Sequence, residues 1–436
     1  MTGETSDSRL SRDLGLRDAV VVGLGSMLGA GVFAALGPAA QAAGSALLVG
    51  LLIAAIVAYC NATSSAQLAA AYPESGGTYV YGRRRLGPLW GFLAGWAFVV
   101  GKIASCAAMA LTFGAYAAPA VARPLAVAAV AGLTAVNYRG VRKTAGLTTA
   151  IVIVVLLALA AVVAGALTGG TASPRHLRSI SDADPRGVLQ AAGLLFFAFA
   201  GYARIATLGE EVRDPQRTIP RAIPLALGVT LGVYALVAVA TLLAVGPERL
   251  GAAETPLAVA LNQGRWAALT PVVRVGATVA ALGVLLSLLV GVSRTVFAMA
   301  VNRDLFMPLA AVHPRHRVPH RAELLVATLV VAIVLVADVR GAIGFSSFAV
   351  LTYYAIANAA AWTQSGDERR WPRALQVAGV LGCGVLAFSL PAAAVAGGAG
   401  VLAAGAIWWW ARRTFLRRLR RRDRPKRRSN PDGDVS

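Results

Sequence analysis

An apolar stretch near the N-terminus combines the length of a membrane span with a glycine-rich centre. It covers residues 20–37 (VVVGLGSMLGAGVFAALG) and places Gly23, Gly25, Gly29 and Gly31 at mid-depth. Each glycine in a helix interior costs roughly 1 kcal/mol relative to alanine. A helix that is interrupted here exposes backbone N–H and C=O groups, which need partners inside a bilayer. A bound solute with a carboxylate and an ammonium group would supply those partners.

Three simpler interpretations of the same stretch compete with a binding site. Gly25 and Gly29 form a GxxxG pair, which is typical of close helix packing. The pair Gly23 and Gly25 suits a dinucleotide-binding turn, but that turn requires a preceding strand in a soluble βαβ unit, and the flanks here are apolar. A signal peptide is the third interpretation. Because the run is long and many further apolar runs follow, we expect a retained span.

Charged residues inside other apolar runs are the next chemically unusual feature. Lys102 lies well inside one run, and Arg204 and Glu210 lie along another. A charge at the bilayer centre costs roughly 3 kcal/mol or more, so such residues usually face a cavity or a partner. Glu210 is about 9 Å along a helix from Arg204, too far for a one-turn pair. Lys102 is a candidate for proton coupling or substrate contact, or it snorkels from a helix end. Glu210 and Glu211 are candidates for a cytoplasmic gate with Arg213 or Arg217.

The composition indicates a polytopic membrane protein. Of 436 residues, 57% are hydrophobic and 14% are charged, whereas soluble domains carry about 25% charge. Runs of about 20 apolar residues predict about twelve transmembrane helices. Their expected limits are 18–38, 44–70, 88–118, 123–139, 145–169, 187–209, 221–246, 267–301, 322–338, 343–363, 374–391 and 393–411.

The basic residues predict the orientation of the spans. Arginine clusters follow the second, fourth, sixth, eighth and tenth runs, whereas the alternate loops are poor in them. The positive-inside rule then places both termini in the cytoplasm, in an inner or plasma membrane. A net charge of +21 is therefore explained by loops, and no nucleic-acid partner is expected. We expect tails at 1–16 and 412–436, a core at 17–363 and two further helices at 374–411. The basic C-terminal tail is also a candidate for contact with anionic lipid.

The sixth run contains a second candidate interruption. Phe197, Phe199 and Gly201 share its centre, and Arg204 follows three residues later. Interrupted helices in matching positions of two inverted repeats hold the substrate between them in many transporters. The first and sixth runs are five apart and run in opposite directions.

Four motifs together resemble the amino acid–polyamine–organocation (APC) superfamily of amino acid permeases. They occur in order along most of the chain. They are residues 25–33 (GSMLGAGVF), 72–81 (YPESGGTYVY), 196–202 (FFAFAGY) continuing through 210–221 (EEVRDPQRTIPR), and 293–315.

The resemblance implies a five-plus-five inverted-repeat core with discontinuous helices 1 and 6. It implies that N–H groups of Gly29, Ala30 and Gly31 bind the substrate carboxylate. It implies that carbonyl groups just before the two breaks bind the substrate ammonium group. By motif position these carbonyl groups belong to Met27, Phe197 and Ala200, and Gly201 follows at the second break. Phe197 or Phe199 would form an aromatic gate. These roles agree with the preference of helix N-termini for anions and of free carbonyls for cations.

The chain departs from the family in two places. Many members carry a lysine in the fifth span where others bind sodium, but the fifth span here has no charged residue. Members that select cationic side chains often have an acidic residue after the sixth-span interruption, where this chain has Ala203 followed by Arg204. The second departure favours a neutral or anionic substrate side chain over lysine, arginine or a polyamine.

We therefore expect a secondary active amino acid transporter that works by alternating access, with a proton or a counter-substrate as its coupling partner. The alternatives are a membrane sensor or scaffold that binds amino acids without net transport, and a permease for polyamines or other organic cations. No nucleophile–base–acid set or metal-binding pattern occurs in a span. We expect no enzymatic activity, no cofactor and no metal.

Overall fold

The protein is built from helices. The computed structural model describes residues 13–72, 76–140, 145–180, 183–206, 208 and 211–422. Within these ranges the secondary structure is helical, apart from one isolated β-bridge between Leu14 and Val212. The expected fold class, an all-α polytopic membrane protein, is confirmed.

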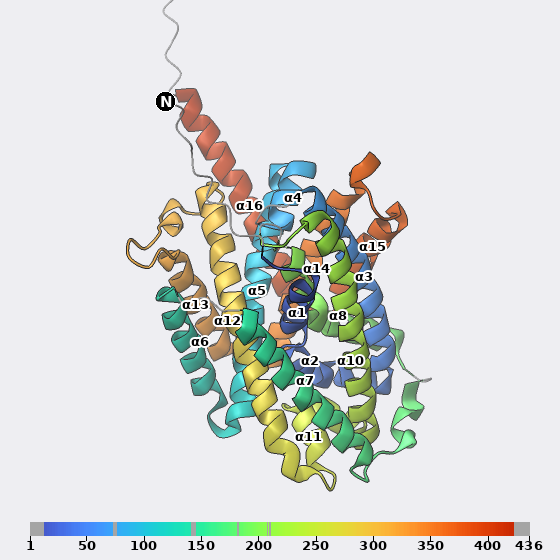
Figure 1. Ribbon diagram of the computed structural model, residues 1–436. Coiled ribbons are helices and arrows are strands. Elements are labelled where there is room, and N and C mark those ends of the chain that lie inside the picture. Colours follow the sequence, from blue (N-terminus) through green and yellow to red (C-terminus); the bar gives the residue numbers. More distant parts are fainter. Residues whose placement is uncertain are drawn as a thin grey trace, which may run out of the picture.

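The expected membrane segments appear as helices in the same order (Figure 1). The first six are α1 (Leu16–Met27) with α2 (Ala30–Ala43), α3 (Leu47–Ala71), α5 (Pro88–Ala117), α6 (Ala122–Tyr138), α7 (Ala145–Thr168), and α8 (Pro185–Phe199) with α9 (Ala203–Ala206). The last six are α10 (Pro215–Ala252), α12 (Thr270–Val301), α13 (His320–Val336), α14 (Val339–Trp362), α15 (Arg373–Ser389) and α16 (Ala392–Arg422). Across the described ranges, nine helical runs are long and apolar enough to cross a membrane. The helices α13 and α15 are shorter, at 17 residues each.

Two connecting loops contain helices that the sequence did not predict. The short helix α4 (Thr78–Arg85) follows Gly77, whose φ of 55° suits glycine. The helix α11 (Pro256–Asn262) begins with a proline, which is favoured at a first helical position. Arg83 of α4 forms an ion pair of 2.7 Å with Asp304, which follows α12. Tertiary contacts therefore order segments that looked like simple connectors.

The first interruption lies between α1 and α2. The chain leaves the helix at Leu28 and re-enters it after Gly29, whose backbone is extended (φ −72°, ψ −156°). The glycines also serve close packing. A Cβ atom on Gly31 would lie 2.8 Å from the Cα atom of Ala198 in α8, and one on Gly25 would lie 3.0 Å from Thr148 in α7. The binding and packing interpretations of the stretch are thus compatible.

The second interruption lies at the end of α8. A 3-10 turn, η4 (Ala200–Tyr202), separates α8 from the short helix α9. A Cβ atom on Gly201 would collide with the carbonyl group of Ser26 in α1. The two interrupted helices therefore touch at their breaks, and glycine permits that approach.

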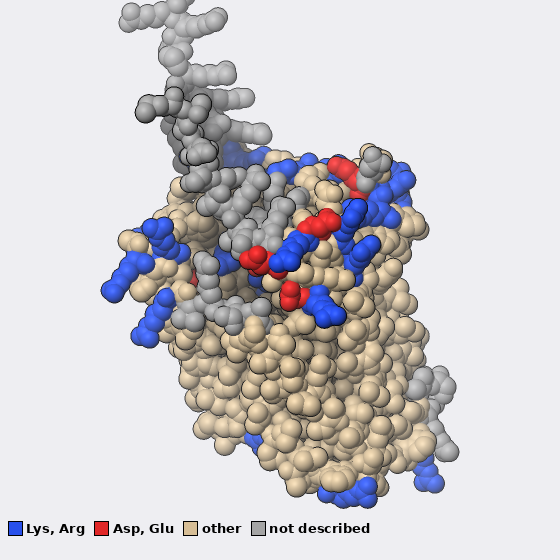
Figure 2. Space-filling view, viewed as in Figure 1, with Lys and Arg blue, Asp and Glu red and all other residues tan. Residues whose placement is uncertain are grey.

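Basic side chains gather at one end of the molecule. Figure 2 shows most of the visible lysine and arginine side chains at the end that carries α4, and few over the long middle part of this face. The C-terminal helix α16 projects from the same end (Figure 1). An uncharged band between charged ends matches a chain that crosses a bilayer.

A buried polar seam joins α3, α14 and α15. The Asn358 amide donates to Asn61 over 2.6 Å and accepts from the hydroxyl of Ser64 over 2.7 Å. The thiol of Cys383 donates to Asn61 over 3.3 Å. Such side-chain hydrogen bonds hold helices together in lipid. Cys383, Cys60 and Cys106 are the three cysteines of the sequence, and each is a buried free thiol.

Candidate functional site

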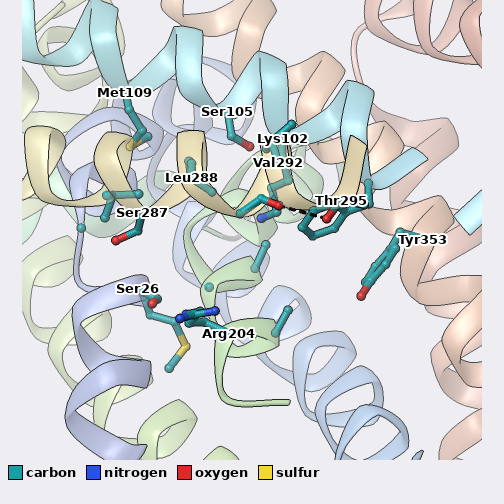
Figure 3. A pocket seen from close by; sticks show the side chains of 18 of the residues that line it. Ser26, Lys102, Ser105, Met109, Arg204, Ser287, Leu288, Val292, Thr295 and Tyr353 are labelled. Atoms are coloured by element: carbon teal, nitrogen blue, oxygen red, sulfur yellow. Dashed lines mark hydrogen bonds between the residues drawn. The ribbon is translucent and has the colours of Figure 1, made fainter. Parts of the chain in front are cut away.

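A cavity of about 240 Å³ lies where the two interrupted helices meet. Its walls come from α1, α2, α8, η4 and α9 on one side and from α5, α12 and α14 on the other (Figure 3). Most of the residues predicted to form the site line it. They are Met27, Gly29, Gly31, Lys102, Phe197, Ala200, Gly201 and Arg204.

The end of α1 and the start of α2 present opposite backbone groups to this cavity. The first turn of α2, from Ala30, leaves N–H groups without intrahelical acceptors, and the helix dipole makes that end attractive to an anion. The end of α1 leaves carbonyl groups that attract a cation. The cavity can therefore hold a zwitterion with its carboxylate at α2 and its ammonium group at α1.

Two tyrosines that the sequence did not single out hold the carbonyl groups near the breaks. The Tyr234 hydroxyl donates to the Met27 carbonyl oxygen, and it lies 3.1 Å from the carbonyl oxygen of Ala198. The Tyr354 hydroxyl donates to the Ala200 carbonyl oxygen over 3.2 Å. Each carbonyl oxygen has two lone pairs, so the bond to the tyrosine does not by itself block a ligand. These tyrosines occur in ordinary apolar runs, and nothing in their spacing indicates this role.

The two phenylalanines of the sixth segment differ in position. Phe197 is half-buried and lines the cavity. Phe199 is fully buried and packs against the ring of Tyr234 at 5.2 Å between centroids. Phe199 does not line the cavity in this conformation, so of these two phenylalanines Phe197 is the one placed to cover a ligand.

Lys102 lies in the middle of α5 and on its cavity face. The face consists of Phe98, Lys102, Ser105 and Met109, which recur at helical spacing. Figure 3 shows the Lys102 side chain across the cavity from Arg204 and Ser26. The residue is only 8% exposed. Among the described residues, none forms a hydrogen bond or ion pair with its ammonium group.

The arginines of the cavity have carboxylates near them. Arg204 of α9 is exposed to the cavity and interacts electrostatically with Glu211. Arg294 of α12 also lines the cavity and interacts with Glu323, a residue of α13 that is 6% exposed. Glu210 lies outside the described residues. The guanidinium group of Arg217 lies 3.7 Å from the carboxylate of Asp214, at the surface.

At the opposite end of the protein, an arginine connects three helices. Arg340, at the start of α14, donates to the Gln41 side chain of α2 and to the Gly251 carbonyl group of α10. It lines a second cavity, of about 230 Å³, with Gln190 and Ala394. No local pattern indicates this contact, because the three elements are far apart along the chain.

Comparisons with known proteins agree with this geometry. The family model described as "Amino acid permease" matches residues 18–365. The chain is similar to an uncharacterized transporter of Mycobacterium tuberculosis, with 63% identity over 95% of this chain and 94% of the relative. It is also similar to the branched-chain amino acid permease BcaP of Bacillus subtilis, with 25% identity over 74% of this chain and 75% of the relative. Cationic amino acid transporter 4 of Homo sapiens shares 29% identity over 80% of this chain and 59% of its own length. The chain belongs to the amino acid permease family.

Proposed function

We propose that this permease moves an amino acid across the cell membrane by alternating access, as a secondary active transporter. The observation that carries the proposal is the contact between Gly201 and Ser26, which brings two helix breaks to one cavity. A membrane helix that needed only to span the bilayer would have no reason to expose its backbone at mid-depth. A substrate with both charges of a zwitterion satisfies both broken ends.

The amino acid binds through its backbone groups. Its carboxylate accepts hydrogen bonds from the N–H groups of Gly29, Ala30 and Gly31. Its ammonium group donates to the carbonyl groups of Met27 and Ala200, with Phe197 above it. The positions of Tyr234 and Tyr354 support this assignment, because they fix the direction of the carbonyl groups.

Access alternates by movement of the interrupted helices against α5 and α12. The core spans residues 17–363, and α15 and α16 add two helices outside it. By the positive-inside rule, α4 and both termini face the cytoplasm, and Arg340 closes the outer side. The cavity residues Arg204, Glu211 and Arg294 then lie on the cytoplasmic route, where they gate or guide the substrate.

Coupling uses either a proton or a second amino acid. The fifth segment, α7, has no charged residue, so a proton carrier must lie elsewhere. Lys102 is the candidate, because it is the buried amine of the cavity. At the cytoplasmic end, Arg413 stacks on Trp409 at 4.3 Å from the ring centroid. This pairing of a basic and an aromatic residue suits an interface with anionic lipid.

Uptake by the purified full chain in proteoliposomes tests the proposal. A panel of labelled amino acids is offered with and without a pH gradient, and with and without unlabelled amino acid inside. We expect saturable uptake that either the gradient or the internal amino acid accelerates. Saturable binding without flux would indicate a sensor or scaffold instead, and preferential uptake of polyamines would indicate a permease for organic cations.

A further inference from the structure

We infer that the substrate carries an anionic side chain, and that Lys102 is the residue that selects it. This inference rests on the proposed function, because it takes the amino acid to be bound at the two helix breaks. It adds the chemical class of the side chain, which the backbone groups cannot choose.

The charges of the cavity carry the inference. Among the described residues, three cationic side chains line the cavity: Lys102, Arg204 and Arg294. Arg204 has Glu211 within electrostatic range, and Arg294 has Glu323. Lys102 has no such carboxylate in the part of the chain that the structure describes. Among the described residues, the three cations of the cavity wall therefore have two carboxylates within electrostatic range, and Lys102 is the cation that has neither.

The environment of Lys102 makes this imbalance costly. The residue is 92% buried, at the middle of a 30-residue helix that crosses the membrane. The neighbouring Ser105 hydroxyl is already engaged with Ser346 and with the carbonyl group of Gly101. The other cavity residues of that face, Phe98 and Met109, offer no charge. A buried ammonium group without a counter-charge is strongly disfavoured, so such a lysine either gains an anionic partner or loses its proton. An anionic group of the substrate is the partner that keeps Lys102 charged.

The backbone groups of the amino acid do not provide that counter-charge. The substrate carboxylate is bound by the N-terminus of α2, and the ammonium group by carbonyl groups near α1. Both lie on the wall opposite α5, as the separation of Lys102 from Ser26 in Figure 3 shows. The substrate group that reaches α5 is the side chain. A carboxylate there gives Lys102 a counter-charge, whereas a neutral side chain gives it none and a cationic side chain is repelled.

The test compares acidic amino acids with their amides, because each pair differs by little more than the charge. The full-length wild-type protein is assayed for thermal stabilisation in detergent and for uptake in proteoliposomes, with glutamate and aspartate against glutamine and asparagine. We expect the acidic member of each pair to bind at least tenfold more tightly. In Lys102→Gln the ratio of acid affinity to amide affinity, measured by thermal stabilisation, should fall at least tenfold. Lys102→Arg should restore part of the preference.

Arg265→Gln is the matched control, because it removes a positive charge at an exposed position beside Trp266, away from the cavity. The preference of Arg265→Gln for the acidic amino acid over its amide should equal that of the wild type. If Lys102→Gln also keeps the wild-type preference, the assignment of Lys102 is overturned. Uptake of neutral or basic amino acids in preference to acidic ones would overturn the substrate class and leave the proposed function intact. Tight binding of glutamate that depends on Lys102, without flux of any amino acid, would uphold the selectivity and overturn transport. If no amino acid stabilises or crosses, both proposals fail.

Discussion

Tyr234 reaches from α10 to the last residue of α1, where its hydroxyl group donates a hydrogen bond to the carbonyl oxygen of Met27. The same hydroxyl group lies 3.1 Å from the carbonyl oxygen of Ala198 in α8. One fully buried side chain thus connects both interrupted helices close to their breaks. It holds the broken ends in register without filling the cavity between them.

Replacing Tyr234 with phenylalanine should weaken both the fold and the site. A buried carbonyl group that loses its donor costs about 1–3 kcal/mol, and a misdirected Met27 carbonyl group binds an ammonium group less well. We expect lower thermal stability and an apparent substrate affinity reduced about tenfold, equal to about 1.4 kcal/mol. Thermal unfolding in detergent and uptake in proteoliposomes measure the two effects. Tyr59→Phe is the control, because Tyr59 is 42% exposed on α3. If Tyr234→Phe and Tyr59→Phe have the same thermal stability and the same apparent substrate affinity, the role given to Tyr234 is ruled out.

A methyl group at Gly201 should separate the two breaks. The added Cβ atom collides with the Ser26 carbonyl group, and backbone shifts of this kind cost about 1–3 kcal/mol. We expect Gly201→Ala to reduce the maximal rate of uptake at least tenfold. Gly232→Ala is the control, because a Cβ atom there meets open space, and alanine is the better helix former. Wild-type uptake by Gly201→Ala would show that the contact between the breaks is dispensable.

Arg340→Ala should open the proposed outer side. The substitution removes the contacts of α14 with Gln41 and Gly251. We expect faster reaction of a membrane-impermeant maleimide with a cysteine at position 394, which lines the adjacent cavity and is 8% exposed. Addition of substrate should change that rate further if access alternates.

The control for this experiment is Arg123→Ala in the same cysteine background. Arg123 donates to the carbonyl group of Leu335 at the end of α13, over 2.8 Å, and is not part of the cavity that Arg340 lines. Its removal should leave the labelling rate unchanged. A labelling rate that Arg340→Ala does not raise would argue that this arginine is only a surface contact.

Asp304→Asn should loosen α4 from the end of α12. Asp304 is 8% exposed and accepts from both Arg83, at 2.7 Å, and Tyr79, at 2.8 Å. Arg83 is 31% exposed, so we expect a loss of about 1–2 kcal/mol, less than for a fully buried pair. Thermal unfolding of Asp304→Asn, Arg83→Gln and the double variant forms a double-mutant cycle. The exposed pair of Asp214 and Arg217 is the control. There, Asp214→Asn should lower the free energy of unfolding by at most about 0.5 kcal/mol.

The order of the membrane helices and the positions of the two breaks could be predicted from the sequence, because both depend on local features. Apolar runs of membrane length set the order of segments, and glycines at Gly29 and Gly201 marked the two breaks. Lys102 and Arg204 stood out as charges in apolar surroundings, and both line the cavity.

The partners of these residues could not be predicted, because they depend on long-range packing. Tyr234 lies 207 positions from the carbonyl group that it holds, and Arg340 lies 299 positions from Gln41. From the sequence alone, Phe197 and Phe199 were equal candidates for the aromatic gate. They differ because Phe197 faces the cavity whereas Phe199 packs against Tyr234, a tertiary contact that no local pattern encodes.

The burial of Cys60, Cys106 and Cys383 has a practical consequence for following the conformational cycle. Because the three residues are at most 3% exposed, we expect water-soluble thiol reagents not to react with them, so that the natural sequence serves as a silent background for site-specific probes. A single cysteine placed on α2 or α14 would carry a spin label or a fluorophore without any compensating substitution. Distances between α2 and α14 then become measurable, with and without substrate, in the protein with its own packing intact.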